Sequence, residues 1–266
     1  LLAWIAPRGI VAAAVSAIFA IRLNEAGHEG ALLLVPLTFA VIIGTVVLQS
    51  ATARPLARLL KVAEPPPSGF LVVGANGPAR VIGKALQQQG SHVVLTDSNW
   101  ENIRAARMDN LPTYFGNPAS QHAETHLDLV GLGHLLALSA SGELNTLAAV
   151  RFAHEFGPRR VFALANGQEH RRSDKHRASH EYRGLALGNP ALTYGQLASE
   201  LSQGAEMYST TLTDNFTWED YQTLHGKRAT LLFARDSTGW VHVVTPESEL
   251  KPGAGWTLLA LIRQDA

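Results

Sequence analysis

The sequence contains no cysteine. Disulfide bonds and thiolate chemistry are therefore excluded, and the composition fits a reducing compartment. The chain also lacks an excess of charge, because 22 Lys and Arg residues balance 22 Asp and Glu residues. A basic surface for nucleic acid has no support from this balance, so no nucleic-acid partner is expected.

Charge is scarcest in two N-terminal runs. Residues 1–21 carry one charged side chain, Arg8, and residues 31–50 carry none. Twenty apolar residues suffice for a helix to cross a hydrocarbon core of about 30 Å. Together with the polar loop 22–30, these runs predict a hairpin of two transmembrane helices within residues 1–63. Two buried helices of a soluble fold are the alternative.

Basic residues predict the orientation of this hairpin. Arg54, Arg58 and Lys61 follow the second run, and the next acidic residue is Glu64. Positive residues favour the cytoplasmic side. We therefore expect a multi-pass protein of the cell (inner) membrane that contacts lipid and carries its soluble domain in the cytoplasm.

The beginning of the chain favours a longer protein. Leu1 lies inside an apolar run, no cationic region precedes this run, and a second apolar run follows, so a cleaved signal peptide is disfavoured. We expect the chain to be a C-terminal piece, with a truncated gene product as the alternative.

Arg8 is costly inside a membrane span, by about 2.5–3.5 kcal/mol on insertion scales. It would have to pair with a carboxylate, line a wet cavity or reach the interface along its own stem. Neither predicted span contains an acidic residue. A partner for Arg8 would therefore have to lie upstream of Leu1.

After a proline-rich linker, residues 64–69, the chain changes to a soluble composition. Residues 70–97 then show the pattern of a strand, a glycine turn, a helix and a second strand that ends on Asp97. This is the opening βαβ unit of a nucleotide-binding fold. Further strands and helices alternate up to residue 165, which predicts a parallel, doubly wound sheet.

The candidate nucleotide-binding residues come from this unit. The dinucleotide fingerprint requires glycine at the first, third and sixth loop positions, which here hold Gly74, Asn76 and Ala79, with Gly77 between them. Asn tolerates positive φ and alanine is common at the sixth position. Asp97 stands where an acid accepts ribose hydroxyls. A Rossmann-like scaffold that binds no ligand is the alternative.

Residues 168–266 predict a helical connection and a small β-rich subdomain. A helix is expected over 194–207, followed by strands over 229–234, 240–244 and 256–262. His176 and His180 have i, i+4 spacing, but without further ligands no metal site is expected. A membrane-anchored NAD-dependent oxidoreductase would need a catalytic residue such as a Tyr/Lys pair. Because Tyr182 and Lys175 are present, this enzyme class is a further alternative. No catalytic triad spacing is present, so the chain is not expected to be an enzyme.

Two segments resemble known families. Pro7-Arg8-Gly9 and the exit from Thr45 to Leu56 resemble the last membrane helices of cation/proton antiporters of the sodium/hydrogen exchanger family. This resemblance implies that Arg8 forms a structural ion pair in a transport core, and that Na⁺ or K⁺ is exchanged for H⁺ by a domain upstream. The carboxylates that bind the ion would lie outside this chain.

Residues 74–86, Asp97, 114–119, 137–139 and 143–145 resemble the RCK or TrkA-N regulatory domain of potassium-transport proteins. The resemblance implies a homodimer that binds NAD(H) or an adenine nucleotide, with Asn117 at the ligand, where the family usually has an aspartate. The expected architecture is two transmembrane α-helices followed by an α/β Rossmann-like doubly wound domain (70–167) and a small TrkA-C-like β subdomain. The expected function is nucleotide-sensing regulation of an antiporter, with a potassium channel or uptake subunit as the alternative.

Overall fold

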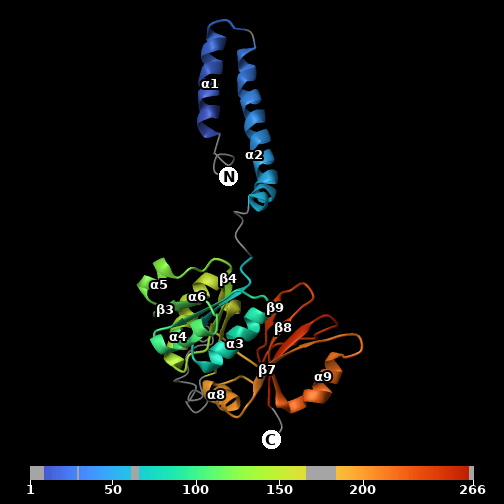
Figure 1. Cartoon of the computed structure of the whole chain (residues 1–266). Helices are drawn as coiled ribbons and strands as arrows, with labels where there is room; N and C mark the ends of the chain where they lie inside the picture. Colours follow the sequence, from blue (N-terminus) through green and yellow to red (C-terminus); the bar gives the residue numbers. More distant parts are fainter. Residues whose placement is uncertain (1–8, 29, 61–65, 166–183, 264–266) are drawn as a thin grey trace, which may run out of the picture. The chain divides into compact units, whose positions relative to one another are not determined.

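The computed structural model describes residues 9–28, 30–60, 66–165 and 184–263. The chain divides into two compact units, residues 1–65 and residues 66–266. Figure 1 shows the elements of each unit.

The first unit is a helical hairpin. Helix α1 (Ile10–Glu25) is followed by the short 3₁₀ helix η1 (Ala31–Leu33) and by helix α2 (Leu34–Leu59). Both long helices run further than expected. Helix α1 continues four residues into the predicted loop, and α2 continues past Ser50 and through Pro55. The predicted bounds were set by charged residues. Such residues limit the part of a helix that can lie in a membrane, but they do not end the helix.

One helix among the described residues has the length and composition to cross a membrane. It covers residues 31–59, and only 6% of its most apolar window is buried. The exposed side chains of this helix include Leu37, Val41, Ile43 and Val47. The described part of α1 has 16 residues, which is short of a full span. The expectation of two transmembrane helices therefore stays a prediction.

The second unit begins with a parallel six-stranded sheet in the order β3-β2-β1-β4-β5-β6. Helices connect most of its strands, which confirms the predicted Rossmann-like doubly wound domain. The elements are β1 (Gly69–Val73), α3 (Gly77–Gln88), β2 (Val93–Asp97), α4 (Trp100–Met108), β3 (Thr113–Phe115), α5 (Gln121–His126), β4 (Leu132–Ala137), α6 (Gly142–Phe156), η2 (Pro158–Arg160), β5 (Val161–Ala163) and β6 (Leu185–Ala186).

The burial of its residues explains how this sheet is packed. Every residue of β1 and of β4 is buried, as expected for central strands covered on both faces. On α3, Ile82, Ala85 and Leu86 form one buried stripe, which packs the helix on the sheet. Gly83 permits that close packing, because a Cβ at this position would lie 3.2 Å from Cδ1 of Leu95.

The rest of the unit forms a second, antiparallel sheet in the order β7-β10-β8-β9. Its elements are α8 (Tyr194–Ser202), β7 (Glu206–Thr211), α9 (Trp218–His225), η5 (Gly226–Arg228), β8 (Ala229–Arg235), β9 (Val241–Val243) and β10 (Thr257–Ile262). The small β subdomain is therefore present. The helix expected over 194–207 ends at Ser202, and strand β7, which sequence patterns did not predict, begins at Glu206.

The two sheets of this unit share one hydrophobic core. The core joins residues of β1, α3 and α4 to residues of β8 and β10. Phe70 of β1 lies against Phe233 of β8, with ring centroids 6.1 Å apart. The antiparallel strands are therefore neither edge strands of the first sheet nor a separately packed domain.

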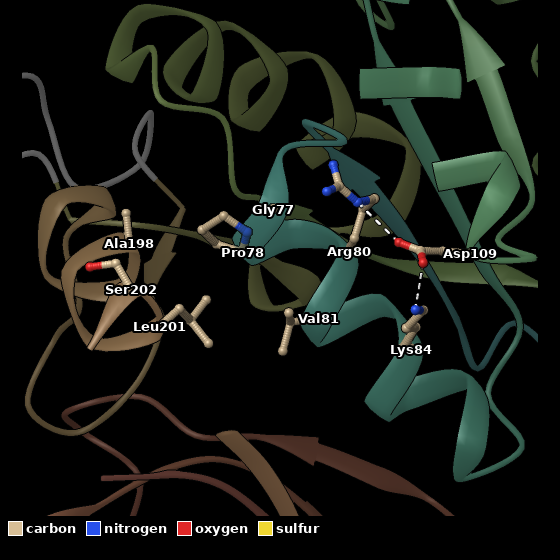
Figure 2. A pocket seen from close by; sticks show the side chains of 9 residues that line it. All are labelled: Gly77, Pro78, Arg80, Val81, Lys84, Asp109, Ala198, Leu201 and Ser202. Atoms are coloured by element: carbon tan, nitrogen blue, oxygen red, sulfur yellow. Dashed lines mark hydrogen bonds and ion pairs between the residues drawn. The ribbon is translucent and has the colours of Figure 1, made fainter. Parts of the chain in front are cut away.

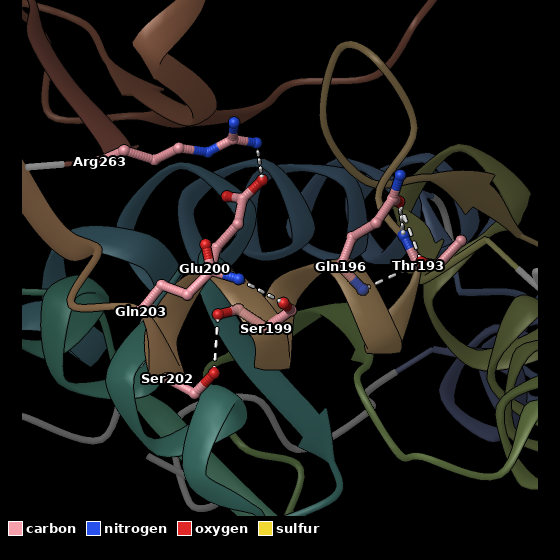
Figure 3. A network of polar contacts seen from close by, with 7 residues as sticks. All are labelled: Thr193, Gln196, Ser199, Glu200, Ser202, Gln203 and Arg263. Carbon is pink, nitrogen blue, oxygen red and sulfur yellow. Dashed lines mark hydrogen bonds and ion pairs between the residues drawn. The ribbon is translucent and has the colours of Figure 1, made fainter. Parts of the chain in front are cut away.

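Helix α8 is joined to the second sheet by a polar network (Figure 3). Its N-terminus is closed by a capping box in which Thr193 and Gln196 bond reciprocally. Further along the helix, a carboxylate oxygen of Glu200 accepts a hydrogen bond from the guanidinium of Arg263, next to β10. This ion pair connects α8 to the strand that lies at the centre of the antiparallel sheet.

The last linker residues are packed against the parallel sheet. The amide of Gly69 donates to the carbonyl oxygen of Gly131 at 2.8 Å. A Cβ at Gly133 would lie only 1.8 Å from the carbonyl oxygen of Pro67, so the linker backbone occupies the place of a side chain. His134 beside it is 5% exposed and stacks on Phe70 at 4.9 Å.

Candidate nucleotide-binding crevice

The candidate site lies where the direction of the sheet reverses. Strand β1 pairs with β2 on one side and with β4 on the other. The sheet continues to β3 beyond β2 and to β5 beyond β4. In open α/β sheets, ligands bind at the carboxyl ends of the strands at such a switch point. The loops after β1, β2 and β4 are therefore the candidate site.

The backbone conformation at position 74 requires glycine. Its φ is +103°, and a Cβ would lie 3.0 Å from the amide nitrogen of Ser139 in the loop after β4. Its own amide donates to the carbonyl oxygen of Thr96 at 2.7 Å. The first fingerprint position thus has the tight turn that its glycine predicts.

Asn76 bridges the loop after β1 and the loop after β4. Its Oδ1 accepts a hydrogen bond from the amide of Ala79 at 3.0 Å, which caps helix α3. Its Nδ2 donates to the carbonyl oxygen of Leu138 at 2.8 Å. Its φ is −64° and its ψ is 172°, so the expectation that tolerance of positive φ explains this asparagine is wrong. Capping and bridging explain it instead.

Few backbone amides of the glycine loop are free to bind an anion. The amide of Ala75 donates to the carboxylate of Asp97, and that of Ala79 donates to Asn76. Pro78 has no amide hydrogen. In the described part of the chain, the amides of Asn76 and Gly77 have no hydrogen-bond acceptor. These two groups are the ones that the loop offers to an anion.

Asp97 accepts three hydrogen bonds at the end of β2. Its Oδ2 accepts hydrogen bonds from the amide of Ala75 at 2.8 Å and from Nδ2 of Asn102 at 2.9 Å. Its Oδ1 accepts from the amide of Asn99 at 2.8 Å. A carboxylate offers about four acceptor positions, so one position on Oδ1 remains for a ligand hydroxyl.

Asn117 lies beyond β3, the strand next to β2. Its side chain is exposed, and its Oδ1 accepts a hydrogen bond from the amide of Ala119 at 2.9 Å. Gly116 before it has a φ of +145° and donates its amide to the carbonyl oxygen of Asp97 at 2.9 Å. The turn after β3 is therefore tied to the end of β2, and Asn117 shapes that turn.

Two further asparagines support the site. Asn145, within a segment used for the family resemblance, is 5% exposed, accepts from the amide of Ser139 at 3.0 Å and donates to its carbonyl oxygen at 2.9 Å. It fixes the loop after β4. Asn102, which donates to Asp97, was missed, although its position on the first turns of the helix after Asp97 is a usable signal.

Several predicted residues lie outside the described residues. They are Arg8, for which a structural ion pair was expected, and Lys175, His176, His180 and Tyr182.

Comparison with known proteins identifies one domain. Residues 70–179 match the family model described as TrkA-N domain. The chain contains a TrkA-N domain. No curated protein matches the chain.

Solved structures give distant likenesses to this TrkA-N domain and its surroundings. The NAD(P)-binding domain of an exopolyphosphatase-related protein from Archaeoglobus fulgidus is 17% identical with a TM-score of 0.36, and the match covers 44% of this chain and 83% of that one. The TrkA-N domain of the inner membrane protein ybaL from Escherichia coli is 17% identical with a TM-score of 0.32, covering 38% and 76%. The GsuK channel bound to NAD is 11% identical with a TM-score of 0.33, covering 93% of this chain and 50% of that one, so the chain spans about half the length of that protein.

Proposed function

We propose that the TrkA-N domain binds NAD(H) or an adenine nucleotide in the crevice at the carboxyl ends of β1, β2 and β4. The observation that carries this proposal is the place of Asp97. Its carboxylate ends β2 beside the switch point and is bonded at 2.8 Å to the amide of Ala75 in the glycine loop. An acid at this place accepts the ribose hydroxyls of a bound nucleotide.

The loop chemistry favours the adenosine part of the ligand over its phosphates. Only the amides of Asn76 and Gly77 are offered to a phosphate by the described loop residues. Asp97 in contrast is a charged acceptor with one position on Oδ1 left for a ribose hydroxyl. Ribose recognition would therefore contribute more to affinity than pyrophosphate recognition.

The test is calorimetric titration of the full chain in detergent with NAD, NADH, AMP and ATP. Binding of at least one adenosine-containing ligand is expected, and Asp97→Asn should weaken it about 10- to 100-fold, because a hydrogen bond to a charged acceptor contributes about 1.5–3 kcal/mol. Asp128→Asn is the matched control, since Asp128 accepts a comparable bond from the amide of Val130 at 2.9 Å outside the crevice. Absence of heat with all four ligands would overturn the proposal.

We further propose that the helical hairpin belongs to a monovalent cation/proton antiporter, and that the TrkA-N domain is its cytosolic, non-enzymatic regulatory part. The support is the apolar, exposed surface of α2 together with the basic residues at its end and the antiporter-like motifs around Arg8 and from Thr45 to Leu56. Bound nucleotide would then change the rate of Na⁺ or K⁺ exchange.

Vesicles containing the protein with its upstream region test this second proposal. Addition of Na⁺ or K⁺ should dissipate an imposed proton gradient, and Arg8→Gln should abolish the exchange. Arg54→Gln, at an exposed position near the end of α2, is the control and should leave it intact. A gradient that neither cation dissipates would contradict the antiporter assignment.

A further inference from the structure

A pocket of about 360 Å³ lies outside the crevice, between helix α3 and helix α8 (Figure 2). One wall is apolar and comes from both helices, with Val81 on α3 and Leu201 on α8. The opposite side is charged and contains Arg80, Lys84 and Asp109. The volume lies in the lower part of the range of small-molecule sites.

The charged side carries a surplus of positive charge. Nε of Arg80 lies 3.1 Å from Oδ2 of Asp109, and Nζ of Lys84 lies 2.5 Å from Oδ1. The hydrogen bond from Lys84 and the nearby cations lower the pKa of Asp109, against a smaller effect of burial, so this carboxylate remains ionised near neutral pH. Two cations and one anion leave a net charge of +1.

The two cations differ in how firmly they are held. Arg80 also donates from Nη1 to the carbonyl oxygen of Ala75 at 3.0 Å, and its side chain is 24% exposed. Lys84 bonds to Asp109 and is 45% exposed. Among the described residues, Nη2 of Arg80 has no acceptor. The pocket thus offers Nη2 of the fixed Arg80 guanidinium and those donors of the Lys84 ammonium group that Asp109 does not use.

We propose that this pocket binds a small organic anion. Its carboxylate or phosphate group lies beside Asp109 and accepts from Nη2 of Arg80 and from the unused donors of Lys84, and its apolar part lies against Val81 and Leu201. A guanidinium donor and an ammonium group together match the oxygen atoms of such a group. The unbalanced charge favours one anionic group, and the apolar wall favours an organic ligand over an inorganic ion.

The pocket is separate from the crevice but connected to its loop. Arg80 contacts the carbonyl oxygen of Ala75, whose amide donates to Asp97. Gly77 lines the pocket and also offers its amide at the start of α3. An anion in the pocket would therefore hold the glycine loop and α8 together. The proposal rests on the pocket alone and does not require that the crevice binds a nucleotide.

The experiment uses the full chain in detergent and three probes: phenyl phosphate, benzoate and inorganic phosphate. Ligand-observed NMR measures their dissociation constants. Phenyl phosphate or benzoate should bind at least fivefold more tightly than inorganic phosphate, and a comparison of the two shows which anionic group fits. Equal binding of inorganic phosphate and both organic probes would overturn the assignment of an organic ligand.

Two variants locate the binding. Lys84→Gln should weaken it at least fivefold, whereas Lys251→Gln, which removes an exposed lysine elsewhere, should not. Ala198→Phe fills the pocket without changing its charge and should abolish binding, with folding checked by thermal melting. Unchanged affinity in either pocket variant would overturn the proposal. Saturating NADH should leave phenyl phosphate bound; competitive displacement would show that the pocket is not a separate site.

Discussion

The two ends of strands β1 and β4 are built differently. At their carboxyl ends, the loops are joined by a side chain, because Nδ2 of Asn76 donates to the carbonyl oxygen of Leu138 at 2.8 Å. Asn76, Gly77 and Ser139 are each partly exposed there. Contacts of this kind can be exchanged for contacts with a ligand at small cost, because side-chain hydrogen bonds contribute only about 0.5–1.5 kcal/mol net.

At the amino ends of the same strands, contacts are made by backbone and buried rings. Gly69 bonds to Gly131, and the carbonyl oxygen of Pro67 lies where a Cβ of Gly133 would stand. His134 is enclosed by Phe70 and by Trp240, with ring centroids 4.9 and 5.6 Å away. A side chain also bridges the strands here, since Nδ1 of His134 lies 3.4 Å from the carbonyl oxygen of Gly69, but this contact is buried.

The two ends of β1 and β4 therefore have different roles. The polar carboxyl end provides groups that a ligand can engage, whereas the packed amino end holds the last residues of the linker. Because both strands are buried along their whole length, they form a rigid connection between the two ends. The following predictions test whether substitutions and pH affect the two ends as differently as their packing implies.

The largest effect is expected for Gly133→Ala. The added Cβ would meet the backbone oxygen of Pro67 at 1.8 Å, and backbone cannot turn aside as a flexible side chain does. We expect a loss of about 1–3 kcal/mol or more in the free energy of unfolding, as for other overpacked sites. Denaturant unfolding followed by tryptophan fluorescence measures it.

Gly77→Ala is the matched control at the carboxyl end. A Cβ there has no heavy atom within 4 Å among those described, and the residue begins helix α3. The substitution should be neutral or stabilise the fold by about 0.4–1 kcal/mol. If both alanines destabilised the protein equally, the contrast between the two ends would be wrong.

Asn76→Gly should produce the next largest effect. Glycine is nearly as good a cap as asparagine, so the main loss is the bond to Leu138, about 0.5–1.5 kcal/mol. Glycine at this fingerprint position also lets a pyrophosphate approach the backbone. The affinity for NAD relative to AMP, measured by calorimetry, should therefore rise.

Asn99→Gly is the control for this bridge. Asn99 caps helix α4 through the amide of Glu101 at 2.9 Å, and its side chain makes no bridge across the crevice in the described structure. Its replacement should leave the ratio of NAD to AMP affinity unchanged. An equal change of that ratio in both variants would rule out the bridge as its cause.

A pH effect is expected at the amino end. Burial lowers the pKa of His134 from its usual value near 6.5, opposed by its bond to Gly69 and assisted by the cation of Arg160. Below about pH 6.5 the unfolded chain then binds more protons than the folded chain, so stability falls as pH falls toward the folded pKa and is unaffected above pH 6.5.

His134→Phe tests this dependence, because it keeps an aromatic ring and removes the titration. The variant should lose less stability than the wild type between pH 7.5 and pH 5.5 in denaturant unfolding. His154→Phe, at an exposed position on α6, should follow the wild type. Parallel pH curves for all three proteins would show that His134 does not contribute.

The smallest effect is expected for Asn117→Asp. An aspartate keeps the acceptor for the amide of Ala119, so stability should change by no more than about 0.5 kcal/mol. The carboxylate that the resembled family usually has would be restored, and the affinity for AMP should rise modestly in calorimetry. Asn215→Asp, also exposed, should leave AMP affinity unchanged; a rise there would point to a general effect of charge.

Local patterns were enough to predict five of the six strands of the parallel sheet, whereas β6 was not predicted. Its main strands are short apolar runs, and Gly74 and Asp97 mark the turn and the end of β2. Strand β7 escaped notice because its sequence, EMYSTT, is polar and its residues are exposed or partly exposed. It is held by pairing with β10 rather than by a buried face. Helix α9 is short and is marked mainly by its capping box.

The site was predictable in part. The positions of Gly74 and Asp97 follow from the fingerprint, whereas the bridge from Asn76 to Leu138 joins residues 62 positions apart. The contact of Pro67 with Gly133 spans a similar separation. Such pairs leave no periodic signal in a single sequence, because they depend on how distant strands are aligned. The pocket between α3 and α8 was missed for the same reason.

Hydrogen exchange of the full chain with and without saturating NADH tests the central contrast most directly. The account predicts slower exchange of amides in residues 74–80 and 97–102 when NADH is present, and no change in residues 67–70 and 131–134. Unchanged exchange at the carboxyl ends, or a change confined to the amino ends, would contradict it.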